Sequence, residues 1–171
     1  MYYNNFTLST FKIRKILKAI FLFLFFPLFF LSCKNLDFFE KTVPLPQQKW
    51  GYDYHPTFTI AITDTVARYN IYIVIRHTDA YKYNNLWIRS DIKFPGDSLR
   101  TQNIDISLAT DAKGWAGKGI DDIFEYRKNV TPGPIALKRS GTYTFTLSQI
   151  MRENPIEHIL NIGVRVEKVK F

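Results

Sequence analysis

The feature that most constrains the fold of this chain is an alternation of apolar and polar residues with a period of two. Within 86–94, for example, Leu86 and Ile88 share one face, while Arg89 and Lys93 share the other. Side chains point alternately to the two faces of a strand, so this period predicts strands buried on one face only. Six segments carry the pattern: residues 57–63, 71–75, 86–94, 104–108, 143–147 and 160–166.

Six half-buried strands predict an all-β fold, specifically an antiparallel β-sandwich of the jelly-roll or Ig-like kind. Pro95-Gly96-Asp97 and Ser140-Gly141 supply turns. The sequence shows no long helical period and no strand–helix–strand alternation, which argues against a nucleotide-binding α/β fold.

The N-terminus carries the features of a secretory signal. Four basic residues precede an unbroken apolar run, Ala19 to Leu31, which ends at Ser32 and Cys33. The run is shorter than the ~20 apolar residues that a membrane span needs, although an uncleaved anchor helix remains the alternative. Leu31-Ser32-Cys33 resembles the lipobox of bacterial lipoproteins, in which the cysteine is acylated. Cys33 is also the single cysteine of the chain, so no internal disulfide can form.

These features divide the chain into a signal peptide (1–32), a lipidated Cys33 with a tether (33–50), and one β-sandwich domain (51–171). The tether is predicted from Pro44 and Pro46 and from weak periodicity. Phe38 and Phe39 within it either touch the membrane surface or pack on the domain.

The charge of the exported part is modest. The formal net charge is +8 for the whole chain; the first 33 residues hold four Lys or Arg and no acidic residue, so 8 − 4 leaves +4 for the remaining 138 residues. That length suits one domain. No basic stripe with interleaved aromatic residues is present, so we expect no nucleic-acid partner.

The segment Lys113 to Tyr126, KGWAGKGIDDIFEY, has the composition of a ligand loop. It lacks the spacing of a phosphate-binding P-loop. It holds one copy of a pattern similar to the calcium-binding β-helix repeat, which binds calcium only where many copies of the repeat stack on one another. A single calcium ion on Asp111, Asp121 or Asp122 stays open. The favoured interpretation is a loop whose glycines permit unusual backbone angles and whose tryptophan covers an edge of the core. The candidate interaction loop consists of Trp115, Gly117, Lys118, Gly119, Asp121 and Asp122.

No enzymatic pattern is present. His55, His77 and His158 are far apart and form no zinc-binding spacing. No Gly-x-Ser-x-Gly elbow occurs, and no acidic pair is placed for glycoside hydrolysis. We therefore expect no catalytic residues, no metal and no cofactor.

Aromatic residues supply a second set of candidates, the surface aromatics Trp87, Tyr81 and Tyr83. Trp87 falls on the strand face opposite Leu86 and Ile88. A large ring on a solvent face indicates either a partner or a local cross-strand pair with Tyr72 or a neighbour.

Several segments together resemble the GldH-type gliding-motility lipoproteins of the Bacteroidetes. They are RYNIYIVIRHTDAYKYNNLWI (Arg68 to Ile88), WAGKGIDDIFE, GTYTFTLSQIMR and IGVRVEK. The resemblance implies a non-enzymatic component of the cell envelope, anchored by its N-terminal lipid and bound to other proteins of the gliding and secretion machinery. A lipid-anchored carbohydrate-binding jelly-roll module is the alternative, with Trp87, Trp115 and the tyrosines as a stacking platform.

The family resemblance also implies a location. Lipoproteins of this phylum that reach the cell surface often carry an acidic cluster after the acylated cysteine, whereas here Lys34 comes first and Asp37 is the first acid. We therefore expect an outer-membrane lipoprotein that faces the periplasm.

Overall fold

The computed structural model describes residues 14–15 and 37–169. Residues 37–169 belong to one compact unit. The predicted signal peptide and Cys33 lie outside the described residues, so their assignment stays a prediction. Within 14–15 and 37–169, no helix is long and apolar enough to cross a membrane.

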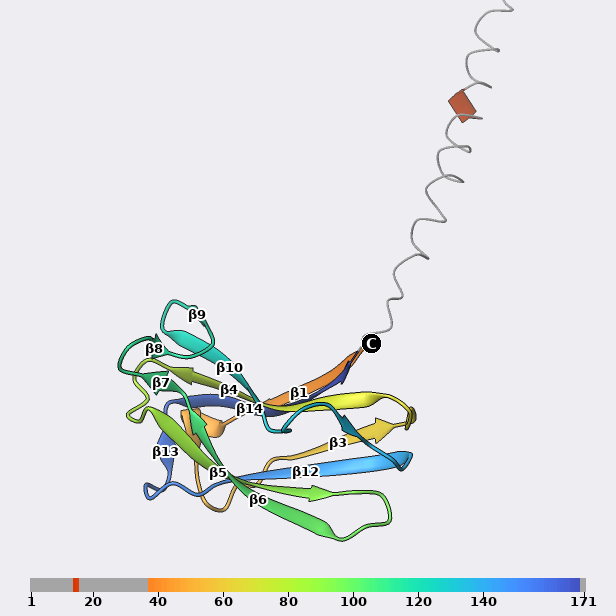
Figure 1. Ribbon diagram of the computed structural model, residues 1–171. Helices are drawn as coiled ribbons and strands as arrows, with labels where there is room; N and C mark the ends of the chain where they lie inside the picture. The colour runs from red at the N-terminus through yellow and green to blue at the C-terminus, as the bar shows by residue number, and fades with distance from the viewer. Residues whose placement is uncertain (1–13, 16–36, 170–171) are drawn as a thin grey trace, which may run out of the picture. The chain divides into compact units, whose positions relative to one another are not determined.

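Two antiparallel sheets pack face to face, as predicted (Figure 1). The first sheet has the order β1 (Phe38–Pro44), β14 (Ile159–Val169), β4 (Arg68–Thr78), β10 (Ile123–Asn129) and β9 (Lys118–Ile120), with β11 (Ile135–Ala136) paired to the start of β4. The second has the order β3 (Thr57–Ile62), β12 (Gly141–Gln149), β5 (Asn85–Lys93) and β6 (Leu99–Ser107). Short pieces complete the described fold: a 3-10 turn η2 (Pro46–Gln48), β2 (Lys49–Trp50) paired with β13 (Ile156–Glu157), and β7 (Ala109–Thr110) paired with β8 (Gly114–Trp115).

The strand order is that of a jelly roll. If the eight longest strands are numbered 1 to 8 along the chain, the two sheets have the orders 1-8-3-6 and 2-7-4-5. After each strand the chain crosses to the other sheet, except at the hairpin between β5 and β6. Two interleaved Greek keys of this kind define the jelly roll, so the Ig-like alternative is excluded.

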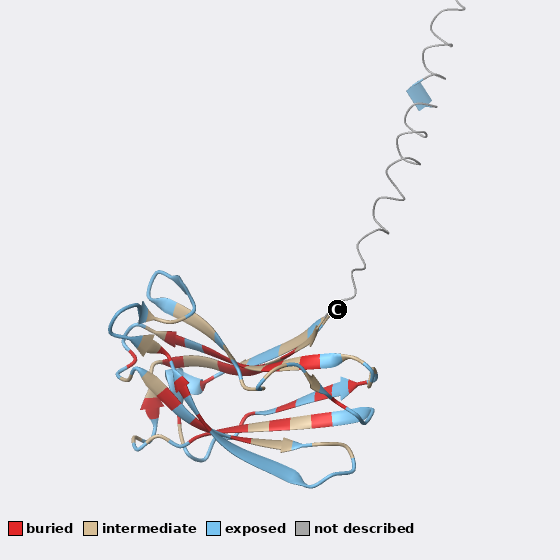
Figure 2. Cartoon of the chain, viewed as in Figure 1, coloured by how far each residue is buried: buried red, intermediate tan, exposed pale blue. Residues whose placement is uncertain are grey.

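The core lies between the sheets and is formed by the apolar sides of the six predicted strands. Figure 2 shows buried and exposed residues alternating along these strands. Leu86, Ile88 and Leu147 are fully buried, and Phe145 and Val164 are nearly so. Each such side chain contributes about 1.5–3 kcal/mol by leaving water, which is how a fold without disulfides can hold together.

The tether prediction is wrong from residue 38 onward. Residues 38–44 form β1 in register with β14, and Trp50 is completely buried. Phe39 packs against the core, while Phe38 stays partly exposed beneath the guanidinium of Arg165, which lies 3.8 Å from its ring centroid. Only Lys34 to Asp37 then separate Cys33 from the domain.

The alternation of apolar and polar residues did not reveal β1, because a charged side chain of β1 is bound by charged side chains from distant strands. The carboxylate of Glu40 accepts hydrogen bonds from Arg127 on β10 (3.0 Å) and Arg165 on β14 (2.9 Å). These two guanidinium groups, Arg127 first, hold the pKa of Glu40 below its ordinary value. β10 was missed for the same reason, since its residues Glu125 and Arg127 form ion pairs with Arg76 on β4 and Glu40 on β1.

The strands run between two ends of the sandwich. We call the end with Phe38, Arg68, Leu99, Gly141 and Val169 the proximal end, because the chain enters the fold there. It lies at the right of Figure 1. The other end, with Thr78, Asn85, the hairpin of β9 and β10, and the β2–β13 pair, is the distal end.

Candidate functional site

The predicted interaction loop forms the β9–β10 hairpin at the distal end. Ile120 and Ile123 are paired, and Asp121 and Asp122 make the turn between them. Asp121 adopts a left-handed backbone (φ 54°), and the backbone carbonyl of Asp122 accepts a hydrogen bond from the amide of Asp79 (2.8 Å). Among the described residues, no three His, Cys, Asp or Glu side chains converge as metal ligands.

The two glycines of the loop serve conformation and close packing. Gly117 has φ 95°, and a side chain there would also run into the backbone carbonyl of Glu125. A Cβ atom on Gly119 would lie 2.8 Å from the ring of Phe124. Lys118, between them, is exposed. The hairpin therefore requires small residues at both glycine positions for structural reasons.

Trp115 joins a buried cluster of rings beneath this hairpin. Its indole contacts the imidazole of His77 edge-on, with centroids 4.6 Å apart, and lies 6.0 Å from Phe124 and 6.4 Å from Tyr81. The ring is partly buried and packs against the core. Trp115 thus covers an edge of the core, as the sequence predicts.

His77, at the centre of this cluster, is fully buried. Its Nδ1 donates a hydrogen bond to the carbonyl of Thr78 (2.9 Å). Its Nε2 has no hydrogen-bond partner among the described residues. Burial lowers the pKa of His77, because a charged imidazole would lose its hydration there.

The set of surface aromatics is only partly correct. Tyr81 is 3% exposed, and its hydroxyl donates to the carbonyl of Asn85 (3.0 Å), so its prediction as a surface residue is wrong. The turn after β4 folds Tyr81 back onto His77, which strand alternation cannot reveal. Tyr83 is half-buried, and its hydroxyl donates to the carboxylate of Glu153, which also pairs with Lys82. These bonds, that of Tyr83 first, lower the pKa of Glu153.

Trp87 is the one member of that set that presents its ring to solvent, with 40% exposure. Its cross-strand partner is Asp105, and Tyr72 lies in the other sheet, so the predicted pair with Tyr72 does not form. The segment after β12 continues beside Trp87. The amide of Ile150 donates a hydrogen bond to the carbonyl of Trp87 (3.0 Å), and the hydroxyl of Tyr52 donates to the carbonyl of Met151. Tyr52, Trp87 and Ile150 form an exposed apolar group that we call the Trp87 patch.

The distal end therefore presents two apolar features, the hairpin tip and the Trp87 patch. Ile120 is 79% exposed, and Ile123 beside it is also exposed. Sequence reasoning missed Ile120, Ile123 and Ile150. Their signal was weak, because each lies in or next to a turn or loop, where alternation does not report which way the side chain points.

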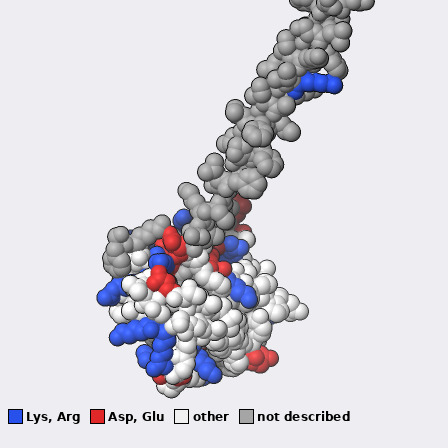
Figure 3. All heavy atoms as spheres, turned by 90° about the vertical axis from the view of Figure 1, so that its right-hand side faces the viewer, with Lys and Arg blue, Asp and Glu red and all other residues white. Residues whose placement is uncertain are grey.

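The two ends of the sandwich differ in charge. Counted over the last three residues of each strand and the loops beyond them, the proximal end carries eight basic and six acidic residues: Arg68, Lys93, Arg100, Arg127, Lys128, Lys138, Arg139 and Lys168 against Asp37, Glu40, Asp64, Asp91, Asp97 and Glu167. The distal end, counted in the same way, carries six basic and nine acidic residues: Lys49, Arg76, Lys82, Lys113, Lys118 and Arg152 against Asp53, Asp79, Asp105, Asp111, Asp121, Asp122, Glu125, Glu153 and Glu157. The formal net charge is therefore +2 at the proximal end and −3 at the distal end. Figure 3 looks onto the proximal end and shows Lys and Arg side chains spread over it.

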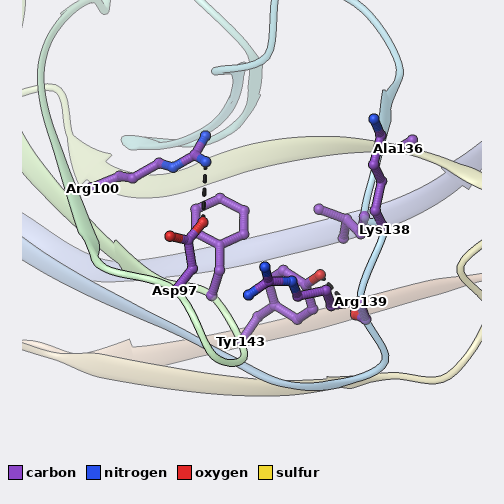
Figure 4. A pocket seen from close by; sticks show the side chains of 8 residues that line it. Asp97, Arg100, Ala136, Lys138, Arg139 and Tyr143 are labelled. Atoms are coloured by element: carbon purple, nitrogen blue, oxygen red, sulfur yellow. Dashed lines mark hydrogen bonds and ion pairs between the residues drawn. The ribbon is translucent and has the colours of Figure 1, made fainter.

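A cavity of about 360 Å³ opens at the proximal end (Figure 4). The turn between β5 and β6 and the segment before β12 form its walls. Arg139 is fixed there by hydrogen bonds to the carbonyls of Pro95 (3.1 Å) and Gly96 (2.6 Å), and Arg100 pairs with Asp97 (3.2 Å). The lining residues are Phe94, Asp97, Arg100, Ala136, Leu137, Lys138, Arg139 and Tyr143. Three of them are cationic and one is anionic, so the cavity suits an anionic group.

Comparison with known proteins gives one consistent result. A family model described as GldH lipoprotein matches residues 37–166. A protein of Christiangramia forsetii named gliding motility lipoprotein GldH homolog is 27% identical over 161 residues, which cover 88% of this chain and 95% of that protein. The gliding motility lipoprotein GldH of Flavobacterium johnsoniae is 25% identical over 130 residues, covering 70% and 77%. No solved structure gives a significant match.

Proposed function

The chain belongs to the GldH lipoprotein family, and from this premise we propose that it is a lipid-anchored component of a gliding-motility machinery that acts by binding other proteins. The relatives in Christiangramia forsetii and Flavobacterium johnsoniae carry gliding motility in their names. The proposal assigns the chain no catalytic step. Its partners are other envelope proteins of the gliding and secretion machinery.

The distal end is the observation that carries this proposal. Ile120, Ile123 and the Trp87 patch are apolar side chains held in water on rigid elements. Exposed apolar groups surrounded by charged residues are typical of protein-binding surfaces. The acidic surroundings of the distal end favour a partner with basic residues around an apolar centre.

The arrangement of the aromatic residues disfavours the carbohydrate-binding alternative. A stacking platform needs several exposed rings side by side, but Tyr81 is buried and Trp115 packs against His77. Tyr83 is held by Glu153. Trp87 remains, accompanied by Tyr52 and the aliphatic Ile150, which suits a protein surface better than a sugar ring.

The proposed anchor is an acyl modification of Cys33 on an outer-membrane protein that faces the periplasm. Fatty-acid labelling of cells that produce the native chain or Cys33→Ala tests the modification. Label is expected in the native chain alone, and equal labelling of both would overturn it. Membrane fractionation and protease treatment of intact cells then test the location; digestion by external protease while periplasmic controls survive would contradict the facing.

The protein-binding role is tested with the double variant Ile120→Asp, Ile123→Asp in the source bacterium. Both side chains are exposed, so the fold should lose little stability. We expect normal protein levels, loss of cell movement on surfaces, and loss of a defined crosslink from a photoreactive residue at position 118. The matched control is Thr59→Asp, Ala61→Asp on the exposed face of β3. Normal movement and an unchanged crosslink in the hairpin variant would refute the proposed surface.

A further inference from the structure

We propose that the proximal end of the jelly roll is a membrane-docking surface that binds anionic phospholipid headgroups, so that the domain stands on its bilayer with the distal end directed away from it. This inference rests on the proposed acyl anchor at Cys33. It adds a second membrane contact, made by the folded domain itself, and it fixes which surface is left for proteins.

The length of the connecting chain brings the proximal end to the membrane. β1 begins at Phe38, and only Lys34 to Asp37 separate it from Cys33. Five peptide steps from Cys33 to Phe38 span at most about 18 Å when fully extended. An acylated Cys33 lies at the bilayer surface, so the proximal end cannot leave that surface by more than this distance.

Charge complementarity selects the orientation within that short reach. The proximal end has a balance of +2 and the distal end −3. An anionic bilayer attracts the first and repels the second. Lys93 and Lys138 are exposed and make no ion pair with any described residue, so both are available to headgroups.

Two of the most exposed apolar side chains in the described part of the chain lie at this end. Val66, between β3 and β4, is 93% exposed, and Leu99, beside the β5–β6 turn, is 60% exposed. Phe38 lies at the start of β1, also partly exposed. Exposed apolar side chains at an end with a net positive charge match the interface between headgroups and acyl chains.

The cavity adds a place for a headgroup. Arg100, Lys138 and Arg139 line it, and the two arginines are already positioned by Asp97 and by the carbonyls of Pro95 and Gly96. A lipid phosphate there would meet preorganised cations rather than flexible ones. Each Lys or Arg near an anionic membrane raises affinity by roughly fivefold, so several acting together favour one orientation of the anchored domain.

The test measures orientation in the acylated full-length protein. Cys33 is the single native cysteine, so once it is acylated a cysteine introduced elsewhere is the one free thiol. Val66→Cys, Leu99→Cys and, as the distal control, Ile120→Cys are each labelled with an environment-sensitive fluorophore. The proteins are reconstituted into vesicles of phosphatidylethanolamine, with or without phosphatidylglycerol.

In vesicles with phosphatidylglycerol we expect blue-shifted emission at positions 66 and 99, quenching by spin-labelled lipid, and protection from aqueous iodide. The label at position 120 should remain open to iodide. The variant Lys93→Glu, Lys138→Glu should abolish the protection at 66 and 99. The variant Lys113→Glu, Lys118→Glu changes the net charge equally at the distal end and should leave the protection intact.

Three outcomes would overturn the inference. Equal iodide quenching at 66, 99 and 120 in an anchored protein would show that the proximal end does not dock, while the anchor itself stands. Protection that appears only after envelope proteins are added would make this end a protein-binding surface. A chain that is not acylated and does not stay with vesicles would remove both the anchor and the docking surface, whereas the Ile120 and Ile123 variants test the protein-binding role separately.

Discussion

Replacing Trp115 with Ala should destabilise the protein substantially. The indole contacts the imidazole of His77 edge-on, with ring centroids 4.6 Å apart, and lies 6.0 Å from Phe124, whose ring stacks on the same imidazole at 5.8 Å. Removing it would open the ring cluster to water and leave the base of the β9–β10 hairpin without its support. The substitution therefore affects a core edge and a candidate binding loop together.

The expected loss follows from the degree of burial. Removing a fully buried aromatic side chain costs about 3–5 kcal/mol. Trp115 is only partly buried, so the part of its surface that stays in water does not contribute to stability. We therefore expect a loss of about 2–4 kcal/mol in the free energy of unfolding. For a domain of this size, roughly 4 °C per kcal/mol gives a melting temperature lowered by about 8–16 °C.

Urea and thermal unfolding, followed by far-ultraviolet circular dichroism, measure this loss. Trp87→Ala is the matched control, because Trp87 is exposed and its change should stay within about 0.5–1 kcal/mol. If Trp115→Ala melts like the native protein but loses the crosslink from the hairpin, the assignment of Trp115 to the core edge is wrong and the residue belongs to a binding site.

Two further substitutions test the fold. Gly163→Ala would place a Cβ atom 2.5 Å from Cγ2 of Thr42 and 2.8 Å from its Cα. It should lower the free energy of unfolding by about 1–3 kcal/mol and speed hydrogen exchange in β1. Gly133→Ala, with open space around it, should have neither effect. Burial lowers the pKa of His77, so the unfolded chain takes up its proton more readily; stability should fall as the pH drops below about 6.5 and level off below the folded pKa. His77→Phe should flatten that part of a pH series of unfolding curves. An unchanged slope in His77→Phe would contradict the assignment.

Local alternation was sufficient for the strands that face the core. The six predicted segments are all strands, and Trp87 lies on the exposed face as expected. Burial between two sheets imposes a period of two on any such strand, so the pattern is written in consecutive residues. The glycines of the hairpin were also predictable, because Gly117 needs a positive φ that few other residues adopt.

Features that depend on contacts between distant segments could not be predicted. Glu40 fixes β1 through Arg127 and Arg165, which are 87 and 125 residues away along the chain. No local pattern marks such a partner, so β1 was assigned to a tether. Tyr81 was misplaced for a similar reason, since a turn after β4 brings it onto His77.

The sequence by itself predicted an export signal, and it determined the single cysteine, the all-β class and the apolar side of each core strand, because each of these is written in neighbouring residues. Only the tertiary structure decided the jelly-roll order and the division of the surface between two ends. Val66, Leu99 and Lys138 are far apart in sequence and lie at the same end because the strands next to them begin or end there. The direction and pairing of the strands decide which segments share an end of the sandwich, and both follow from packing over the whole chain.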